Sequence, residues 1–446
     1  MKLKIKTINF ETGNTKDVVL NIKDALKLGQ KAGDRINIKN LESKNIEEKY
    51  WIAILQIDYS NSIVKPGEIG VFLDIIKEKP SLKDNMILSV KPADPPDSFK
   101  FIQKKIKGSK LTTEEINNIV SDTVSGSLSK IDLAAFITAV FINGMDNEEM
   151  TSLANAESRS GEIFNFGPEV YDKHSTGGVP GNKVSLIIVP IVAAAGLTIP
   201  KSSTRAITSP SGTADSMEVL APVTFEADTL KSIVSKENAC IIWGGALNTS
   251  PADNVLIEIE RPLRMDPIGL MIPSIITKKL SLGVKKLVLD IPVGEGTKFT
   301  TPHDGKQFAY VFKEIARNVG VQAECALTLA HQPIGHAVGP GLEAKEALTL
   351  LMDYSVGPNS LIEKSTDLAG ILLEMGGKAQ KGMGQKLAKD ILRSGKAYEK
   401  MKKIIGAQGG NSELKPEEIK LGPYNKEFFA TKPGHITGVN NAIINQ

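Results

Sequence analysis

The chain has 446 residues, of which 41% are hydrophobic and 24% are charged, and this composition is typical of a globular protein rather than a disordered or fibrous one. A chain of this length is expected to form roughly three domains of about 150 residues each. Because 54 basic residues nearly balance 51 acidic residues, the formal charge is only +3 and predicts neither a nucleic-acid partner nor a membrane surface.

Residues 1–90 predict a small β-rich N-terminal domain. Short alternating runs such as Lys2–Ile5 and Arg35–Ile38 are typical of strands. The start of the chain lacks the unbroken apolar stretch of a signal peptide. A stiff connector is expected after this domain, because three prolines fix their own φ angles: Pro92, Pro95 and Pro96.

Residues 97–165 predict a helical domain, to which we expect about 252–285 to contribute. Thr112 and Glu115 have the spacing of a capping box, as do Asp146 and Glu149. Between the two boxes, the apolar face of Ile131–Ile142 predicts a helix that stops at Gly144.

Residues 166–430 predict a large α/β domain with a mixed sheet, because strand-like runs alternate with glycine-rich loops and helical stretches. Leu287–Ile291 and Ala323–Leu329 are expected strands. The apolar run Leu186–Leu197 is shorter than the roughly 20 residues of a membrane span and contains Pro190, so we expect a buried helix. Residues 431–446 are interpreted as the start of a shortened C-terminal segment.

The segment DKHSTGGVPGNKVS, residues 172–185, is a candidate anion site. Its glycines allow close backbone approach, its lysines and serines donate hydrogen bonds, and the N-terminus of the apolar helix that follows favours an anion. The segment does not match a Walker A loop, because only three residues separate Gly177 from Gly181. The structural alternative is an ordinary glycine-rich turn.

Two further segments carry candidate chemistry. Residues 202–215 place Arg205 and several hydroxyls in one loop that suits a phosphate or ribose, although a surface turn explains the same pattern. In residues 261–279, Asp266 is a candidate carboxyl acid, and Ser274 and Lys278 are spaced to share one helix face. A helix-capping Asp266 is the structural alternative.

A metal site is not expected. The five histidines include His331 and His336, which lack the spacing of a zinc helix, and the two cysteines, Cys240 and Cys325, are far apart and unclustered. Such cysteine usage fits a reducing cytoplasm. His174, inside the 172–185 segment, is a candidate substrate contact.

Taken together, five ordered motifs resemble those of the thymidine phosphorylase family, and more closely its AMP phosphorylase branch. The resemblance extends to about residue 435. The motifs are KHSTGGVPGNKVS, TRAITSPSGTAD, WGGALNTSPAD, MDPIGLMIPSIITKK and HQPIGHAVGP.

The resemblance implies phosphorolysis of AMP to adenine and ribose 1,5-bisphosphate, with CMP and UMP as further candidate substrates. It implies no cofactor, since inorganic phosphate is a substrate, and a homodimer or larger homo-oligomer. The proton donor corresponds to Asp266, and Lys278 is a candidate base contact. The implied AMP-binding residues are Gly178, Thr204, Arg205, Ala206, Ile207, Thr208, Ser209, Thr213, Ser274 and Lys298. The implied phosphate-binding residues are Lys173, Ser175, Ser185, Ser203 and Thr213.

Departures from the pyrimidine-nucleoside branch favour the AMP branch. The base-reading arginine of the pyrimidine branch falls on Ile259, and its His-Thr-Gly-Gly segment is replaced by Ser209–Gly212. Lys183 and Arg205 are candidate donors for a second phosphate. The family's chain also continues through a further C-terminal segment beyond the position of Gln446.

The expected mechanism follows from the charge that develops when a glycosidic bond breaks. The sugar becomes positive and the departing base negative, so an acid near the base and an anion near the sugar serve the reaction. A raised pKa would keep Asp266 protonated. A thymidine or uridine phosphorylase, a phosphoribosyltransferase and a catalytically inactive nucleotide-binding regulator stay open as alternatives.

Overall fold

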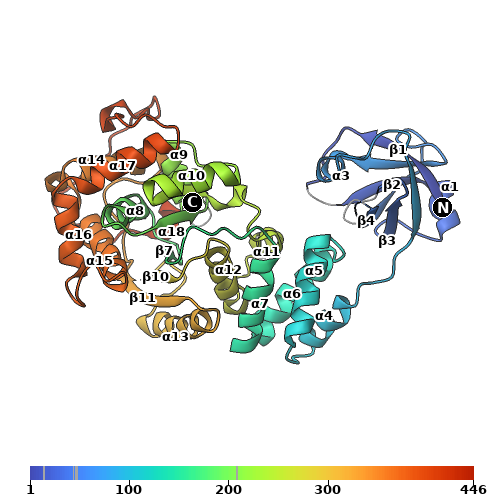
Figure 1. Cartoon of the computed structure of the whole chain (residues 1–446), viewed down its shortest axis with the longest axis horizontal. Helices are drawn as coiled ribbons and strands as arrows, with labels where there is room; N and C mark the ends of the chain where they lie inside the picture. The colour runs from blue at the N-terminus through green and yellow to red at the C-terminus, as the bar shows by residue number, and fades with distance from the viewer. Residues whose placement is uncertain (14–15, 44, 46–48, 207–208, 446) are drawn as a thin grey trace. The chain divides into compact units, whose positions relative to one another are not determined.

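The computed structural model describes every residue of the chain except 14, 15, 44, 46–48, 207, 208 and 446. The described chain forms two compact units (Figure 1). The first comprises Met1–Leu153 with Ala252–Gly269, and the second comprises Ala154–Pro251 with Leu270–Gln446. Among the described helices, none combines the length and apolarity that a membrane-spanning segment requires.

The N-terminal part of the first unit is a closed β-barrel with strand order β1-β5-β2-β4-β3-β6. The strands are β1 (Lys2–Ile8), β2 (Asp17–Asn21), β3 (Arg35–Asn40), β4 (Tyr50–Asp58), β5 (Glu68–Phe72) and β6 (Ile87–Pro92). Two short helices accompany them, α1 (Ile22–Leu28) and α3 (Leu73–Glu78). Alternate residues such as Ile36 and Ile38 are fully buried, so the period-two pattern of the sequence fills the barrel interior.

The helical part of the first unit begins after Pro96. It contains α4 (Ser98–Ile106), α5 (Thr113–Ser125), α6 (Lys130–Asn143), the start of α7 (Asn147–Arg159) and most of α11 (Pro251–Leu263). Both expected capping boxes are present: Thr112 and Glu115 bond reciprocally, and so do Asp146 and Glu149. Gly144 ends α6, as the sequence predicts.

The second unit is an α/β structure with two small sheets, β11-β10-β7 and β8-β9. The strands are β7 (Tyr171–Ser175), β8 (Ile199–Ser203), β9 (Ala239–Trp243), β10 (Lys286–Val293) and β11 (Gln322–Leu329). Every pair among these described strands is parallel, so the expected mixed sheet is wrong. The error has a physical cause, because a βαβ crossover enforces parallel pairing that local sequence does not display.

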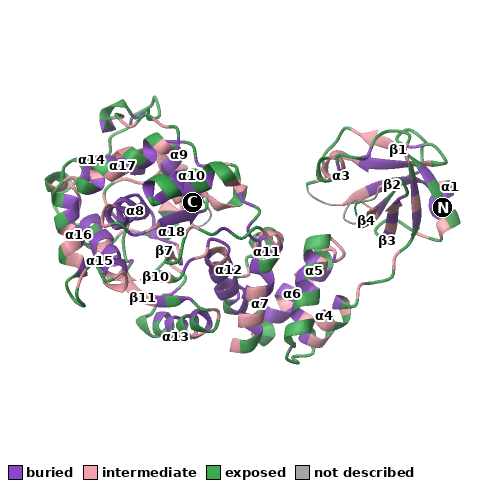
Figure 2. Ribbon diagram, in the orientation of Figure 1, coloured by how far each residue is buried: buried purple, intermediate pink, exposed green. Residues whose placement is uncertain are grey.

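Helices cover the two sheets of the second unit (Figure 1). The helices that contact these strands are α8 (Ser185–Ala194), α9 (Thr213–Glu218), α10 (Ala227–Glu237), α13 (Pro302–Asn318) and α15 (Asn359–Met375). The other helices are α12 (Ile268–Leu280), α14 (Pro340–Met352), α16 (Gly384–Arg393), α17 (Lys396–Ala407) and α18 (Asn441–Ile444). Every residue of α8 from Ser185 to Ala193 is buried, which confirms the expected buried helix (Figure 2). The carboxyl ends of parallel strands are where such folds bind ligands.

Candidate active site

The glycine-rich segment joins β7 to the buried helix α8. Ser185 is the first residue of α8 and is itself buried. Free N–H groups and the helix dipole make the first turn of such a helix favourable for an anion. The segment therefore has the strand, loop and helix order that the sequence predicts for a phosphate site.

Two glycines let this segment pack against other loops. Gly178 has φ +87°, and a Cβ there would lie 3.0 Å from the Cα of Thr297. Gly181 has φ +70°, and its Cβ would lie 2.6 Å from the carbonyl oxygen of Ile334. Both positions have a positive φ and no room for a side chain, so glycine is needed at each. The two glycines thereby allow the segment to pack closely against its neighbours.

Asp290 organises the carboxyl end of the sheet, although none of the sequence motifs includes it. Its carboxylate, fully buried on β10, accepts hydrogen bonds from Ser175 Oγ at 2.9 Å and Thr328 Oγ1 at 2.6 Å. The oxygen that Ser175 contacts, Oδ2, also lies 3.7 Å from Lys173 Nζ and 3.0 Å from Lys364 Nζ. Burial opposes ionisation, but the two lysines and Thr328 keep the pKa of Asp290 below its ordinary value.

Asp172 is the centre of a second buried charge cluster. Its carboxylate is fully buried on β7 and accepts a 2.6 Å hydrogen bond from Lys279 Nζ. Lys201 Nζ lies 3.4 Å from the other carboxylate oxygen and donates to the carbonyl of Ser202 at 2.5 Å. Burial, followed by the nearby Lys279, lowers the pKa of Lys201 to about 7.

His174 lies on β7, between Lys173 and Ser175 in the sequence. Burial lowers the pKa of His174 well below its ordinary value, and the neighbouring Lys279 and Lys201 add to the effect. The imidazole is therefore neutral at pH 7 and does not supply positive charge to an anion. Among the described residues, no group of three histidine, cysteine or carboxylate side chains is placed to hold a metal ion.

The two cations expected to serve a second phosphate have protein partners instead. Lys183 Nζ donates to the carbonyls of Ile334 at 3.1 Å and Ala337 at 2.8 Å, and to Glu346 at 2.5 Å. Arg205 pairs with Asp215 and Glu218. Both cations therefore hold loops in the described structure, and their role toward a second phosphate stays a prediction.

The 202–215 segment runs from β8 into α9. Ser203 Oγ donates to the carbonyl of Ile242 at 2.8 Å, and Thr213 is the first residue of α9. The backbone N–H of Ala206 donates to Asp215, and Ser209 Oγ donates to the carbonyl of Ser211. Thr204 is exposed. The expected contacts Ile207 and Thr208 lie outside the described residues.

The residues of the third motif are divided between the units. Ser274 and Lys278 share one face of α12, with Lys278 Nζ 2.8 Å from Ser274 Oγ, as the spacing predicts. Lys298 Nζ lies 3.3 Å from the sulfur of Met271. Asp266 belongs to the first unit, where it is exposed between α11 and α12. Its role as proton donor stays a prediction.

A short C-terminal helix, α18, packs against the glycine-rich segment. Asn441 Nδ2 donates to the carbonyl of Ala330 at 2.8 Å, and Asn445 Nδ2 donates to the carbonyl of Gly178 at 3.2 Å. A Cβ on Gly296 would lie 3.3 Å from the backbone nitrogen of Ala442. The carbonyl of Gly178 is thereby fixed, which further orders the segment.

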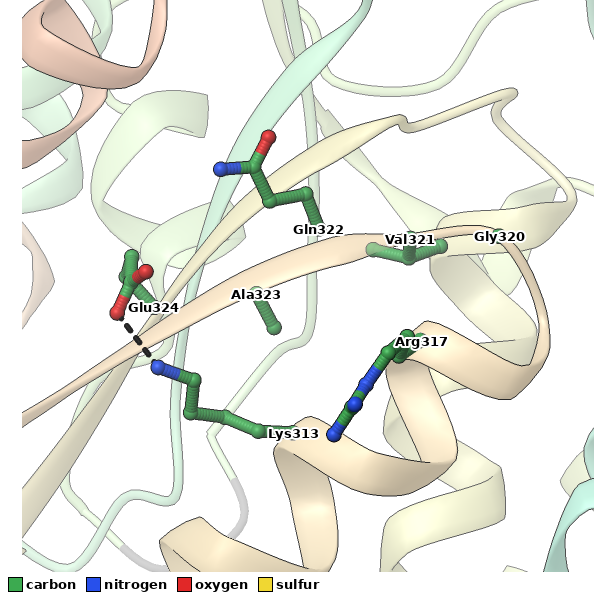
Figure 3. Close-up of a pocket in the computed structure, with 7 residues that line it drawn as sticks. All are labelled: Lys313, Arg317, Gly320, Val321, Gln322, Ala323 and Glu324. Atoms are coloured by element: carbon green, nitrogen blue, oxygen red, sulfur yellow. Dashed lines mark hydrogen bonds and ion pairs between the residues drawn. The ribbon is translucent and has the colours of Figure 1, made fainter.

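A surface hollow shown in Figure 3 lies away from these residues. It is lined by Lys313, Arg317, Gly320, Val321, Gln322, Ala323 and Glu324. Gln322 begins β11, whereas Thr328, beside Asp290, lies near its end. Because ligands of parallel sheets bind at the carboxyl ends, the hollow is at the wrong end of the strand for the predicted chemistry.

Comparison with known proteins assigns the chain to a family. Residues 167–398 match the profile described as "Glycosyl transferase family, a/b domain", and residues 99–161 match "Glycosyl transferase family, helical bundle domain". The AMP phosphorylase of Thermococcus sibiricus is 44% identical over 445 residues, which cover 100% of this chain and 86% of that protein. The chain belongs to the AMP phosphorylase family.

Other relatives agree with this assignment. The AMP phosphorylase of Methanocaldococcus jannaschii is 42% identical over 442 residues, covering 99% of this chain and 86% of the relative. That of Methanosarcina mazei is 44% identical over 450 residues, covering 100% of this chain and 85% of the relative. This family member is therefore an enzyme of the glycosyltransferase class.

The fold is shared more widely than the activity. Anthranilate phosphoribosyltransferase from Thermus thermophilus superposes with a TM-score of 0.59 at 18% identity, covering 69% of this chain and 98% of that one. The enzyme from Saccharomyces cerevisiae, in complex with PRPP and Mg, gives 0.54 at 17% identity, covering 70% and 97%. At such identities the likeness concerns fold alone.

Proposed function

We propose that this chain catalyses phosphorolysis of AMP, releasing adenine and ribose 1,5-bisphosphate. The observation that carries the proposal is the 42–45% identity to AMP phosphorylases over essentially the whole chain. The phosphate-site geometry supports it, since Lys173 and Ser175 meet at Asp290 at the carboxyl end of the sheet. Inorganic phosphate is the second substrate, with no metal or redox cofactor.

In the proposed reaction, phosphate forms a bond to the anomeric carbon of the ribose as the glycosidic C–N bond breaks. The bonding electrons leave with adenine, and Asp266 donates a proton to the purine. The attacking anion is bound by Lys173, Ser175, Ser185, Ser203 and Thr213. Positioning and fixed charge supply most of the rate enhancement. The AMP contacts are those that the resemblance implies, Gly178, Thr204–Ser209, Thr213, Ser274 and Lys298.

Product chromatography tests this reaction directly. The chain is incubated with AMP, with and without inorganic phosphate, and adenine and ribose 1,5-bisphosphate are quantified. We expect adenine release only with phosphate. Release without phosphate would exclude phosphorolysis, and tight AMP binding without any release would favour the inactive regulator. Parallel incubations with CMP, UMP and thymidine define the base and phosphate requirements.

The role of Asp266 is tested by Asp266→Asn. Loss of the proton donor is expected to lower kcat by roughly 10²- to 10⁴-fold, the usual contribution of general acid catalysis. Asp228→Asn is the matched control, because Asp228 is a fully exposed carboxylate on α10. An Asp266→Asn protein with the activity of the control would remove Asp266 from the mechanism.

We further infer a cytoplasmic homodimer or larger homo-oligomer, without nucleic-acid or membrane partners. The near balance of 54 basic and 51 acidic residues supports the absence of a polyanionic partner. Light scattering of the purified chain checks the assembly, and a monomer that turns over AMP at full rate would contradict it.

A further inference from the structure

Lys364 is a lysine with a buried ammonium group, and none of the sequence motifs includes it. It lies on α15, and its side chain is 7% exposed. Its Nζ lies 3.0 Å from Asp290 Oδ2, but no acceptor among the described residues completes a hydrogen bond to it with good geometry. Burying an ammonium group is costly unless its donors are used, so the open donors of Lys364 require an explanation.

Two other buried lysines of this unit, Lys183 and Lys279, do not share this property. Lys183 has three oxygen acceptors, and Lys279 donates to Asp172 at 2.6 Å. Both therefore serve the folded scaffold without any ligand. Lys364 differs because its ion pair leaves hydrogen-bonding capacity unused in a buried place.

The position of Lys364 links it to the proposed phosphate site. Asp290 Oδ2 lies within 3.0 Å of Lys364 Nζ, 2.9 Å of Ser175 Oγ and 3.7 Å of Lys173 Nζ. One carboxylate oxygen thus gathers three donors, two of which are implied phosphate-binding residues. An anion bound by Lys173 and Ser175 lies within reach of the Lys364 ammonium.

The charge of this region also calls for an anion. Around β7 and β10, two buried carboxylates face four lysines whose side chains are at most 7% exposed, namely Lys173, Lys201, Lys279 and Lys364. The lysines outnumber the carboxylates, although Lys201, with a pKa of about 7, is only partly charged at neutral pH. Burial, and to a lesser extent the nearby Lys364, lowers the pKa of Lys173 to about 8. A bound phosphate anion would offset the excess of positive charge.

We propose that Lys364 binds the attacking inorganic phosphate, donating from α15 beside Lys173 and Ser175, and that Asp290 holds these three donors together. The inference rests on the proposed function, because it assigns a further ligand to the phosphate of that reaction. It adds α15 to the site, with Lys364 lying 179 residues after Ser185 in the sequence.

The test compares Lys364→Met with the wild-type chain. We expect the KM for phosphate to rise roughly 10- to 100-fold, the range for losing a hydrogen bond to a charged group, while the KM for AMP stays unchanged. Lys389→Met is the control, since Lys389 pairs with Glu363 of the same α15 at the surface. An unchanged KM for phosphate, or equal increases for both substrates, would overturn the proposal.

A second variant and a second measurement keep the test decisive. Lys364→Gln retains a donor without charge, so it substitutes if Lys364→Met does not fold, and we expect a smaller rise of the same KM. Calorimetric titration with inorganic phosphate alone measures binding without turnover. If the wild-type chain binds phosphate but releases no adenine, the proposed function is wrong. The calorimetric comparison still tests whether Lys364 binds phosphate. Equal phosphate affinity of wild type and folded Lys364 variants removes Lys364 from the site.

Discussion

Asp172 and Asp290 occupy neighbouring strands, and each is a fully buried carboxylate with two lysines nearby. Their lysines are used differently. Around Asp172, Lys279 and Lys201 both donate hydrogen bonds within the protein. Around Asp290, Lys364 makes none with good geometry and Lys173 lies 3.7 Å away. The first cluster is satisfied by the fold, and the second has donors left for a ligand.

This difference shows that a buried ion pair does not by itself indicate a binding site. Replacing both members of such a pair by apolar residues often costs little, whereas removing one member leaves an uncompensated charge and is costly. What distinguishes a site is unused hydrogen-bonding capacity at a place that ligands reach. Strand ends next to a helix N-terminus are such places.

The largest expected effect is a loss of stability when the cluster around Asp172 is broken. Lys279→Met leaves Asp172 without its shortest contact, and breaking a buried pair in this way lowers the free energy of unfolding by about 3–5 kcal/mol. Urea denaturation measures the loss. The KM for phosphate of the folded fraction is expected to stay near the wild-type value. A stable Lys279→Met chain with a raised KM would reverse the roles of the two clusters.

A smaller effect is expected when phosphate fills the open cluster. A ligand at 100 times its dissociation constant stabilises the folded state by about 2.7 kcal/mol, so phosphate is expected to raise the Tm of the wild-type chain. Lys173→Met is expected to lose most of this gain. Thermal unfolding in phosphate and in chloride at matched ionic strength measures both. Equal gains in the two proteins would contradict the assignment of Lys173.

The smallest effect concerns pH. Lys173 has a pKa of about 8, so it is charged below that pH and neutral above it. Because Asp290, Lys364 and Asp172 face this ammonium, its charge belongs to the open cluster. We expect kcat/KM for phosphate to fall about tenfold per pH unit above about 8, as the free enzyme loses this proton. If the pH at which kcat/KM falls is higher in Lys364→Met than in the wild type, the charges of Lys173 and Lys364 are coupled. If kcat/KM instead falls at pH about 7, the pKa of Lys201, the Asp172 cluster is responsible.

Much of the fold was predictable from local sequence. The capping boxes at Thr112 and Asp146, the end of α6 at Gly144 and the burial of α8 all follow from patterns within a few residues. The parallel pairing in the second unit was not predictable in this way. Strands β7 and β10 pair across more than a hundred residues, and no local pattern encodes that register.

The site was predictable only where its residues cluster in sequence. Lys173 and Ser175 stand in a recognisable motif, but Asp290 is a single acid within the apolar strand Lys286–Val293. A charged residue inside a buried strand is itself a signal, because such burial requires partners. Lys364 gives no comparable signal, since lysine is ordinary on a helix and only the packing of α15 reveals its burial.

The contacts of Asp290 also determine when the site can form during folding. Asp290 bonds to Ser175, 115 residues earlier, and pairs with Lys364 on a later helix. Contacts of such long sequence separation form slowly, because loop closure must precede them. After dilution from denaturant, helical content should return before phosphate binding does, with an interval in which the chain is largely structured yet unable to bind its anion.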